Sequence, residues 1–338
     1  MTNPTCLKNL KWKLILITIL FFIVLFFSSC KSKKIEITRT TLSMGTFVQI
    51  DIVTNIKYEE KANSVIDESF KQIKKYDAEF DYRKKGDLNR FNRDSIIEKE
   101  KSPQLFNLIQ KSIIIAKLTN GAFDPTIYPL VKLWGFDDGH PVLPSVDEIK
   151  RALKNVNYRK VKIVNYKITK PSSIKLDLSA IAKGYIVDLT SRYIKSKGFT
   201  NFLINAGGDI FVSGFNKKGE KWKIAIQDPF NPDKYSGILN ITNSSVVTSG
   251  DYENFFIKDD KKYCHILNPK TGYPPFNMHS VTIISEETSF SDAVATAVFV
   301  MGPDKGFNFL KNNNIRGLLI FTDQNKKVIY KATNNFWE

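Results

Sequence analysis

Two oxygen-bearing side chains stand four residues apart near the C-terminal end of the chain, at Asp292 and Thr296. The apolar run from Ser291 to about Met301 predicts a helix, and residues four apart lie on the same helical face. A carboxylate and a hydroxyl on one face suit Mg²⁺, which takes few protein ligands and shares the rest of its shell with phosphates and water. The alternative is a helix N-terminal charge beside a solvated hydroxyl.

His265 is one of three histidines in the chain, and it lies between an expected strand and a turn that contains Pro269 and Gly272. Histidine exchanges a proton near neutral pH, so this position suits a general base. A lone histidine also serves structural roles in folded proteins. Its position in the sequence leaves both interpretations open.

Residues 176–209 combine a helix with a polar site at each end. Asp177 and Lys183 fall at the start of the predicted helix, which a glycine ends. A short apolar strand then leads to Gly207 and Gly208, whose lack of side chains lets backbone N–H groups approach an anionic ligand. The alternative is a tight turn that needs glycine only for positive φ.

Two irregular segments are candidate pocket walls. Residues 121–136 contain closely spaced prolines and aromatic side chains, which suits one side of a pocket that stacks an aromatic ligand. Residues 80–92 are polar and aromatic without a clear period, which predicts a loop that could carry function. The alternatives are a packed surface loop and a plain connector.

Hydrophobic periodicity predicts the elements that must position these residues. Besides the helix after Asp177, helices are expected at residues 58–80, 103–118, 145–153, 291–301 and 306–312. Strands are expected at residues 42–53, 158–164, 173–176, 202–204, 222–227, 235–241, 245–247, 316–322 and 327–330. The alternating pattern of the later strands indicates antiparallel sheet.

The first thirty residues indicate export. Three lysines precede a short apolar run at residues 14–27, which is the pattern of a secretory signal and is short for a membrane span. Small residues directly before Cys30 resemble the lipobox of bacterial lipoproteins, in which the cysteine becomes the lipidated N-terminus. We expect a signal peptide at 1–29, a lipid-anchored tether at 30–40 and attachment, palmitate included, to the cell membrane facing the periplasm or exterior. A plain cleaved signal and an uncleaved anchor are the alternatives.

The formal net charge of +16 indicates a basic surface. Because the lysines are scattered among acids, and exported proteins rarely meet nucleic acid, we expect no nucleic-acid partner. Removal of the leader and acylation of Cys30 would leave Cys264 as the one cysteine of the mature domain, without an internal disulfide.

Seven short motifs, in this order, resemble those of the ApbE family, the bacterial FAD:protein FMN transferases. They are Met44-Gly45-Thr46 and residues 121–125, 176–184, 205–209, 248–250, 265–272 and 292–296. Each motif alone is weak evidence for a family, whereas seven motifs in the expected order are specific evidence. The resemblance runs from about residue 42 to the C-terminus.

The resemblance implies an α+β fold of the ApbE type, similar to the T-fold, with antiparallel sheets packed with helices in a single catalytic domain over 41–338. It also implies the reaction. FAD, the substrate, would be cleaved at its pyrophosphate, and FMN would be joined through a phosphoester to a threonine, sometimes a serine, of an exported or membrane acceptor protein, releasing AMP. Mg²⁺ would be the cofactor.

The resemblance also assigns residues. Asp292 and Thr296 side chains and the Ala180 carbonyl would bind Mg²⁺, and His265 would deprotonate or orient the acceptor hydroxyl, with Asp292 as the second catalytic residue. The expected FAD site comprises Met44, Tyr82, Ala122, Phe123, Asp124, Asp177, Lys183, Gly207, Gly208, Ser249 and Ile266.

The chain departs from the family pattern at three places. Ala295 stands where some members have a second acid, Asn268 stands where aspartate is common, and residues 80–82 replace a loop that often contains serine. Two other functions are compatible with the sequence: a Mg²⁺-dependent FAD pyrophosphatase that yields FMN and AMP, and an exported FAD-binding lipoprotein without turnover.

Overall fold

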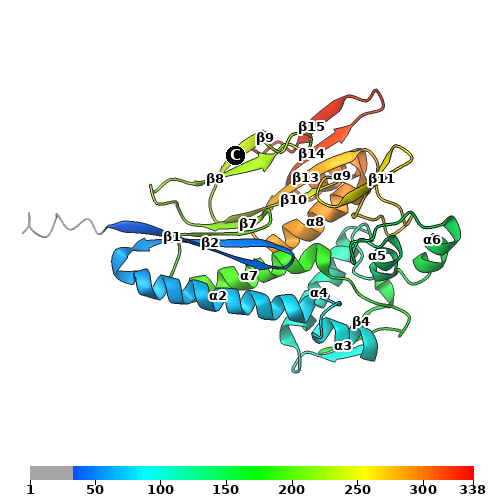
Figure 1. The fold of residues 1–338 in the computed structure, drawn as a ribbon, viewed down its shortest axis with the longest axis horizontal. Helices are drawn as coiled ribbons and strands as arrows, with labels where there is room; N and C mark the ends of the chain where they lie inside the picture. Colours follow the sequence, from blue (N-terminus) through cyan, green and yellow to red (C-terminus); the bar gives the residue numbers. More distant parts are fainter. Residues whose placement is uncertain (1–32) are drawn as a thin grey trace, which may run out of the picture.

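An eight-stranded antiparallel sheet forms the centre of the molecule (Figure 1). The computed structural model describes residues 33–338. Across the sheet the strands are β1 (Lys34–Ser43), β2 (Thr46–Asn55), β6 (Phe202–Ala206), β7 (Asp209–Ser213), β10 (Ser244–Gly250), β13 (Met278–Ser285), β14 (Arg316–Thr322) and β15 (Val328–Ala332). Helices pack on one face of this sheet and a β-hairpin packs on the other. The expected α+β class, with antiparallel sheets packed with helices in one domain, is confirmed.

β1 extends the sheet further toward the N-terminus than the sequence indicated. Each of its residues pairs with a residue of β2. The expected tether at 30–40 is therefore wrong for residues 34–40, which belong to the sheet, and the domain begins before residue 41. Because β1 is an edge strand whose residues are mostly exposed or half-buried, its polar composition resembles that of a tether.

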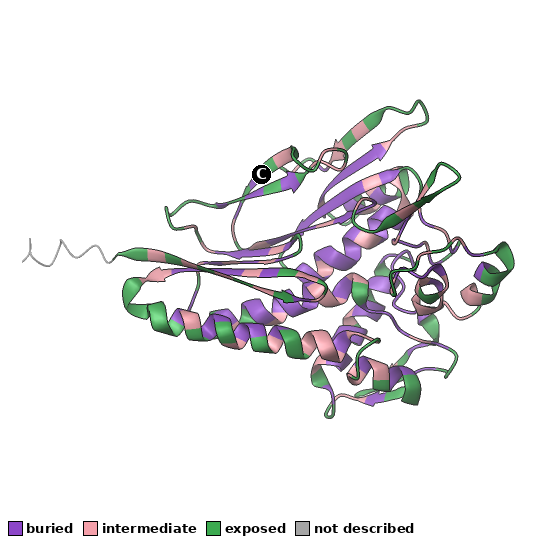
Figure 2. Cartoon of the chain, in the orientation of Figure 1, coloured by how far each residue is buried: buried purple, intermediate pink, exposed green. Residues whose placement is uncertain are grey.

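Five helices form the layer on one face. They are α2 (Glu59–Phe80), α4 (Pro103–Leu118), α7 (Ser179–Ser196), α8 (Thr288–Met301) and α9 (Pro303–Asn312). Each was expected close to these bounds, and those of α4 agree to the residue. Figure 2 shows α2 with a buried side toward the sheet and an exposed side outward, as amphipathic periodicity requires, whereas α8 lies inside the domain and has no exposed residue.

α7 and α8 cross with their backbones in contact at Gly184. A Cβ on Gly184 would lie 2.6 Å from the carbonyl oxygen of Thr288 and 2.8 Å from the Cα of Ser289. Glycine therefore lets the two helices approach more closely than any other residue would.

The hairpin on the opposite face consists of β8 (Trp222–Gln227) and β9 (Tyr235–Ile241), both as expected. Its inward side chains, among them Trp222 and Ile224, form a second core with the fully buried Phe336. The sheet thus has a hydrophobic layer on each face, which accounts for the near-continuous burial of its central strands.

The 3₁₀ turn η1 (Ile56–Tyr58) links β2 to α2. The other small elements surround the end of the molecule where α7 begins. They are the 3₁₀ turn η2 (Tyr158–Lys160), the helices α3 (Asp87–Asp94), α5 (Tyr128–Trp134) and α6 (Val146–Leu153), and the strands β3 (Ile96–Glu98), β4 (Lys162–Val164), β5 (Lys167–Thr169), β11 (Phe255–Lys258) and β12 (Lys261–Cys264). α6 begins with the expected capping box, in which Ser145 and Glu148 exchange hydrogen bonds.

Some local expectations were wrong. Residues 80–92 include most of α3, a short helix whose N-cap, Gly86, offers no side-chain bond, so the sequence lacked a start signal. Residues 173–176 form no strand, because the Leu176 backbone pairs with the side-chain amide of Asn92. β13 was not anticipated at all.

None of the helices within residues 33–338 is long and apolar enough to cross a membrane. The expected signal peptide at 1–29 and lipidation at Cys30 lie outside the described residues. Both stay predictions.

Replacing Gly184 with alanine should lower the free energy of unfolding by about 2–3 kcal/mol, because the added methyl group must push α8 away from α7. Urea denaturation followed by circular dichroism measures the change. Arg192→Ala, on the exposed side of the same helix, is the matched control and should cost less than about 0.5 kcal/mol. Equal stability of the two variants would contradict the close crossing.

Candidate functional site

Three adjoining cavities open where the start of α7 meets α8 and the loops after β10 and β12. We call them the outer cavity (about 620 Å³), the inner cavity (about 180 Å³) and the hairpin cavity (about 730 Å³). Their defining residues are Met44, Tyr82, Phe136 and His265 for the outer cavity, Phe123, Ala180, Asp292 and Thr296 for the inner cavity, and Gly208, Ala225, Tyr235 and Thr248 for the hairpin cavity. Lys183 lines all three, so it marks their junction.

The start of α7 is irregular, and this irregularity shapes the inner cavity. The buried Asp177 side chain accepts a hydrogen bond from the Ser179 N–H at 2.8 Å. Ala180 has φ −82° and ψ 17°, which are not helical values. The Gly184 N–H, which a regular helix pairs with the Ala180 carbonyl, donates to Asp292 Oδ2 at 3.1 Å. The Ala180 carbonyl is thereby made available to a ligand in the cavity that it lines.

Asp188 of α7 caps the N-terminus of α8. Its carboxylate oxygens accept hydrogen bonds from the backbone N–H groups of Thr288 at 2.7 Å and Ser289 at 3.0 Å. The sequence predicted a helix from Ser291, whereas α8 begins at Thr288. The capping residue lies 100 positions away in the sequence, so no local pattern reveals it. The cap fixes the position of α8 against α7.

Three carboxylates surround Lys183 at the cavity junction. Lys183 Nζ lies 3.4 Å from Asp209 Oδ1. Burial raises the pKa of Asp209, and burial together with the charge of Asp209 raises the pKa of Asp292 well above its usual range. Burial also raises the pKa of Glu253. Burial opposes the charge on Lys183, but the nearby acids outweigh it and raise the Lys183 pKa. The cluster therefore places three buried acidic groups around one lysine, and their raised pKa values show that full ionisation of all three is unfavourable without a further positive charge.

Oxygen ligands suited to a hard cation converge on the inner cavity. The structure brings Ala180, Asp292 and Thr296 together in its wall. The Thr296 hydroxyl lies 3.4 Å from the Ser249 hydroxyl, so this contact is weak. Asp209 Oδ2 is buried and has no hydrogen-bond partner among the described residues. A cation here would bind the unpaired oxygen and would favour the ionised form of the buried carboxylates, so the residues fit a metal ion.

No group of three or more His, Cys, Asp or Glu side chains within residues 33–338 forms a metal cluster. A site for Mg²⁺ does not require one, because this ion keeps several water molecules and accepts hydroxyl and carbonyl oxygens. Asp292 is then the one carboxylate among the three expected ligands, in line with alanine at position 295.

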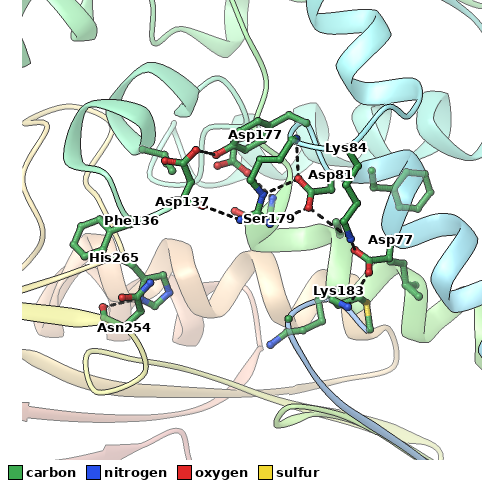
Figure 3. A pocket seen from close by; sticks show the side chains of 18 residues that line it. Asp77, Asp81, Lys84, Phe136, Asp137, Asp177, Ser179, Lys183, Asn254 and His265 are labelled. Carbon is green, nitrogen blue, oxygen red and sulfur yellow. Dashed lines mark hydrogen bonds and ion pairs between the residues drawn. The ribbon is translucent and has the colours of Figure 1, made fainter. Parts of the chain in front are cut away.

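His265 faces the outer and inner cavities from the loop after β12 (Figure 3). Its backbone N–H donates to the Asn254 carbonyl at 2.9 Å, and its Nδ1 lies 3.2 Å from the same oxygen. Because a carbonyl only accepts, Nδ1 carries the hydrogen and Nε2 keeps a free lone pair. Burial lowers the pKa of His265, so the ring is neutral at neutral pH. His265 is thus arranged to accept a proton.

The outer cavity combines aromatic surface with fixed polar groups. The Tyr82 hydroxyl donates to Asp137 Oδ2 at 2.8 Å. Across the cavity, Asp77 accepts a hydrogen bond from the Met44 N–H at 2.8 Å and pairs with Lys84 Nζ at 2.8 Å (Figure 3). Walls of this kind suit a flat heteroaromatic ligand with polar edges.

The segment 121–136 has two roles. Phe123 lines the inner cavity, whereas Trp134 is fully buried and donates from Nε1 to the Gly272 carbonyl at 2.9 Å. That bond holds the loop that follows His265. The expected irregular wall is therefore partly helical, because residues 128–134 form α5.

The predicted binding residues are divided among the cavities. Tyr82 lines the outer cavity; Met44 the outer and hairpin cavities; Asp177 the outer and inner cavities; Lys183 all three; Ala122, Phe123, Asp124, Ser249 and Ile266 the inner cavity; Gly207 and Gly208 the hairpin cavity. The two glycines thus lie apart from the outer and inner cavities, which hold the other predicted binding residues. Asp124 also orders its own loop, because it accepts hydrogen bonds from the N–H groups of Thr126 and Tyr158.

Sequence reasoning missed five residues that shape the site. They are Asp137, Asp188, Asp209, Glu253 and Asn254. Asp209 had a visible signal, since it directly follows the paired glycines. Asp137, Asp188 and Glu253 act through partners far away in the sequence, which no local spacing shows. Asn254 contacts His265 across the β11–β12 hairpin, which the sequence analysis did not predict.

Comparisons with known proteins agree with this geometry. Residues 44–319 match the family model of the ApbE family. A curated relative from Vibrio cholerae, named FAD:protein FMN transferase, is 31% identical over 306 residues, covering 88% of this chain and 91% of the relative. A relative of the same name from Klebsiella pneumoniae is 35% identical over 238 residues, covering 68% of this chain and 72% of that protein.

Solved structures extend the likeness to the fold. The flavin transferase ApbE from Vibrio cholerae superposes with a TM-score of 0.79 at 27% identity, covering 90% of this chain and 98% of that one. The ApbE protein from Thermotoga maritima gives a TM-score of 0.81 at 28% identity, covering 89% and 98%. The similarity therefore includes both the sheet and the helices that carry the site.

Replacing Asp188 with alanine should lower the free energy of unfolding by about 2 kcal/mol, because the buried N–H groups of Thr288 and Ser289 lose their acceptor. Urea denaturation measures the loss. Asp304→Ala, at an exposed acid in the first turn of α9, is the control and should cost about 0.5 kcal/mol or less. Similar losses in both variants would rule out Asp188 as the cap of α8.

Proposed function

We propose that this chain, which belongs to the ApbE family, transfers the FMN portion of FAD to a threonine or serine hydroxyl of an acceptor protein and releases AMP. The expected family and the expected transferase class are confirmed by relatives named FAD:protein FMN transferase. One observation carries the proposal: His265, Asp292, Thr296 and Ala180, from three separate segments, line one cavity. Together they offer the proton acceptor and the hard oxygens that phosphoryl transfer uses.

FAD, the proposed substrate, fits the outer and inner cavities taken together. Its isoalloxazine ring would lie against Tyr82 and Phe136, and its pyrophosphate would reach Lys183 at the junction. A lysine ammonium group is a suitable partner for phosphate oxygens. This arrangement would leave the hairpin cavity free.

Mg²⁺ is the proposed cofactor, held by the side chains of Asp292 and Thr296 and by the Ala180 carbonyl. The buried, unpaired Asp209 Oδ2 and the excess of carboxylates around Lys183 support a cation at this place. When bound, the ion would offset negative charge on the pyrophosphate.

His265 is proposed as the residue that prepares the acceptor. Its Nε2 would take the proton of the acceptor hydroxyl, and the hydroxyl oxygen would form a bond to the phosphorus on the riboflavin side of FAD. The bond from that phosphorus to the bridging oxygen would break, and AMP would leave with the electron pair. The free lone pair on Nε2 and the lowered pKa of His265 support this role.

We further propose that the enzyme is lipid-anchored at Cys30 and faces the periplasm or cell exterior. The basic leader, the short apolar run and the small residues before Cys30 support export and lipidation. Its acceptors would then be exported or membrane proteins, and nucleic acid would not be a partner.

Hydrolysis of FAD to FMN and AMP is the alternative reaction, because water can replace the acceptor hydroxyl in the same geometry. A flavin-binding lipoprotein without turnover is the other alternative. Release of AMP excludes the second, and an FMN-sized mass on an acceptor separates transfer from hydrolysis.

Asp292→Asn should lower the rate of AMP release from FAD by about 10²- to 10³-fold, because it removes the one charged ligand of the proposed metal site. Addition of EDTA to the wild type should have a similar effect, which excess Mg²⁺ should reverse. AMP is measured by chromatography, with Asp304→Asn on the exposed start of α9 as the control. Unchanged AMP release in Asp292→Asn would refute the metal role.

His265→Gln should lower the rate of FMN transfer by about 10²- to 10⁴-fold, with a much smaller change in FAD affinity. Because burial lowers the pKa of His265, the wild-type ring is already deprotonated at neutral pH, so its rate should not rise between about pH 7 and about pH 8. Stopped-flow rates across this range, with flavin fluorescence for binding, provide the check. A rate that climbs over this range would argue against a base with a lowered pKa.

A further inference from the structure

The hairpin cavity differs from the other two in what forms its walls. It lies between the β1–β2 turn at Gly45, the β6–β7 turn at Gly207 and Gly208, and the β8–β9 hairpin at Ala225. Apart from Lys183 of α7, turns and strands therefore surround it. It shares Lys183, Thr248 and Glu253 with the inner cavity, so the two are continuous.

One wall of this cavity is an open strand edge. β10 pairs with β13 from Ser245 to Gly250, but on its other side it pairs with β7 only from Ser244 to Val246. The Asp251 N–H donates to the His279 carbonyl at 3.0 Å on the β13 side. Because backbone groups alternate along a strand, those of Thr248 and Gly250 point to the opposite side, where β7 has ended. These N–H and C=O groups are positioned to bind another strand.

The β6–β7 turn leaves open space in the cavity because the turn consists of glycine residues. Gly208 has φ +97°, and a Cβ placed on it would have no atom within 4 Å. Gly207 instead packs against the Thr46 side chain. A side chain at position 208 would thus project into the open space, whereas glycine leaves room for a second backbone.

We propose that the hairpin cavity binds an extended segment of the acceptor protein, which adds as a strand to the free edge of β10. This proposal rests on the proposed function. Once FAD occupies the outer and inner cavities, the acceptor hydroxyl must reach the phosphate from a different side than the leaving AMP. The hairpin cavity supplies such an approach, because it ends at Lys183 and Glu253, where the inner cavity begins. Main-chain pairing would hold acceptors of varied sequence in one register.

The test uses FAD, Mg²⁺ and a pool of peptides of about nine residues with a central threonine and randomised flanks. Ala225→Trp adds an indole on the exposed face of β8 at a position that lines the cavity, where it should obstruct entry. Lys223→Trp, two residues earlier on the same exposed face and outside the cavity, is the matched control. The measured quantity is the ratio of FMN-labelled peptide to total AMP released. We expect Ala225→Trp to lower this ratio by at least about tenfold, and Lys223→Trp to match the wild type.

Hydrogen exchange tests the pairing itself. The N–H groups of Thr248 and Gly250 should exchange at least about tenfold more slowly when the peptide pool is added to the FAD-loaded enzyme, and FAD alone should not have this effect. Unchanged exchange at both positions would overturn addition to β10.

Failure of the inference and failure of the proposed function give different results. A normal labelling ratio in Ala225→Trp, or a loss of FAD affinity in proportion to the loss of labelling, would overturn the acceptor groove; the second result would assign the cavity to FAD. Wild-type enzyme that releases AMP but labels no peptide would indicate hydrolysis of FAD and would contradict the proposed transfer. Wild-type enzyme that releases no AMP from FAD would contradict both proposed reactions.

Discussion

Each of the two central helices holds the backbone of the other with an aspartate, and the site depends on this exchange. Asp188 of α7 binds the first N–H groups of α8, and Asp292 of α8 binds the Gly184 N–H of α7. Gly184 makes the exchange feasible, because it lets the backbones touch. The same crossing of the two helices therefore directs the Gly184 N–H to Asp292 and brings Ala180 and Asp292 into the wall of one cavity.

The buried carboxylates at this helix crossing favour the binding of a cation and lower the stability of the domain without one. Asp209 and Asp292 are both buried and interact electrostatically with each other, and Lys183 is the positively charged neighbour of both. Desolvated like charges raise the free energy of the folded state unless a counter-charge is supplied. A cation would supply the counter-charge that these carboxylates lack, and any ligand that binds only the folded domain would stabilise it by mass action.

The sequence predicted elements whose pattern is local and missed those whose pattern is set by distant partners. The helix at 103–118 was located to the residue because it carries its own apolar period and an N-terminal proline. β13 is buried on both faces and has no alternation to detect, while β1 is an edge strand with a polar composition. Within the site, family motifs gave Ala180, Asp292 and Thr296, which meet in one wall. The roles of Asp188 and Glu253 arise from contacts across the fold, so spacing could not show them.

The early start of β1 limits how far the domain can reach. Strand pairing begins at Lys34, so only residues 31–33 separate Cys30 from the sheet. Three residues span at most about 10 Å when fully extended. If Cys30 carries the proposed lipid, these three residues would hold the domain close to the bilayer surface, and the domain would diffuse essentially in two dimensions. Encounters with partners would then depend on how far each partner's own linker extends from the membrane.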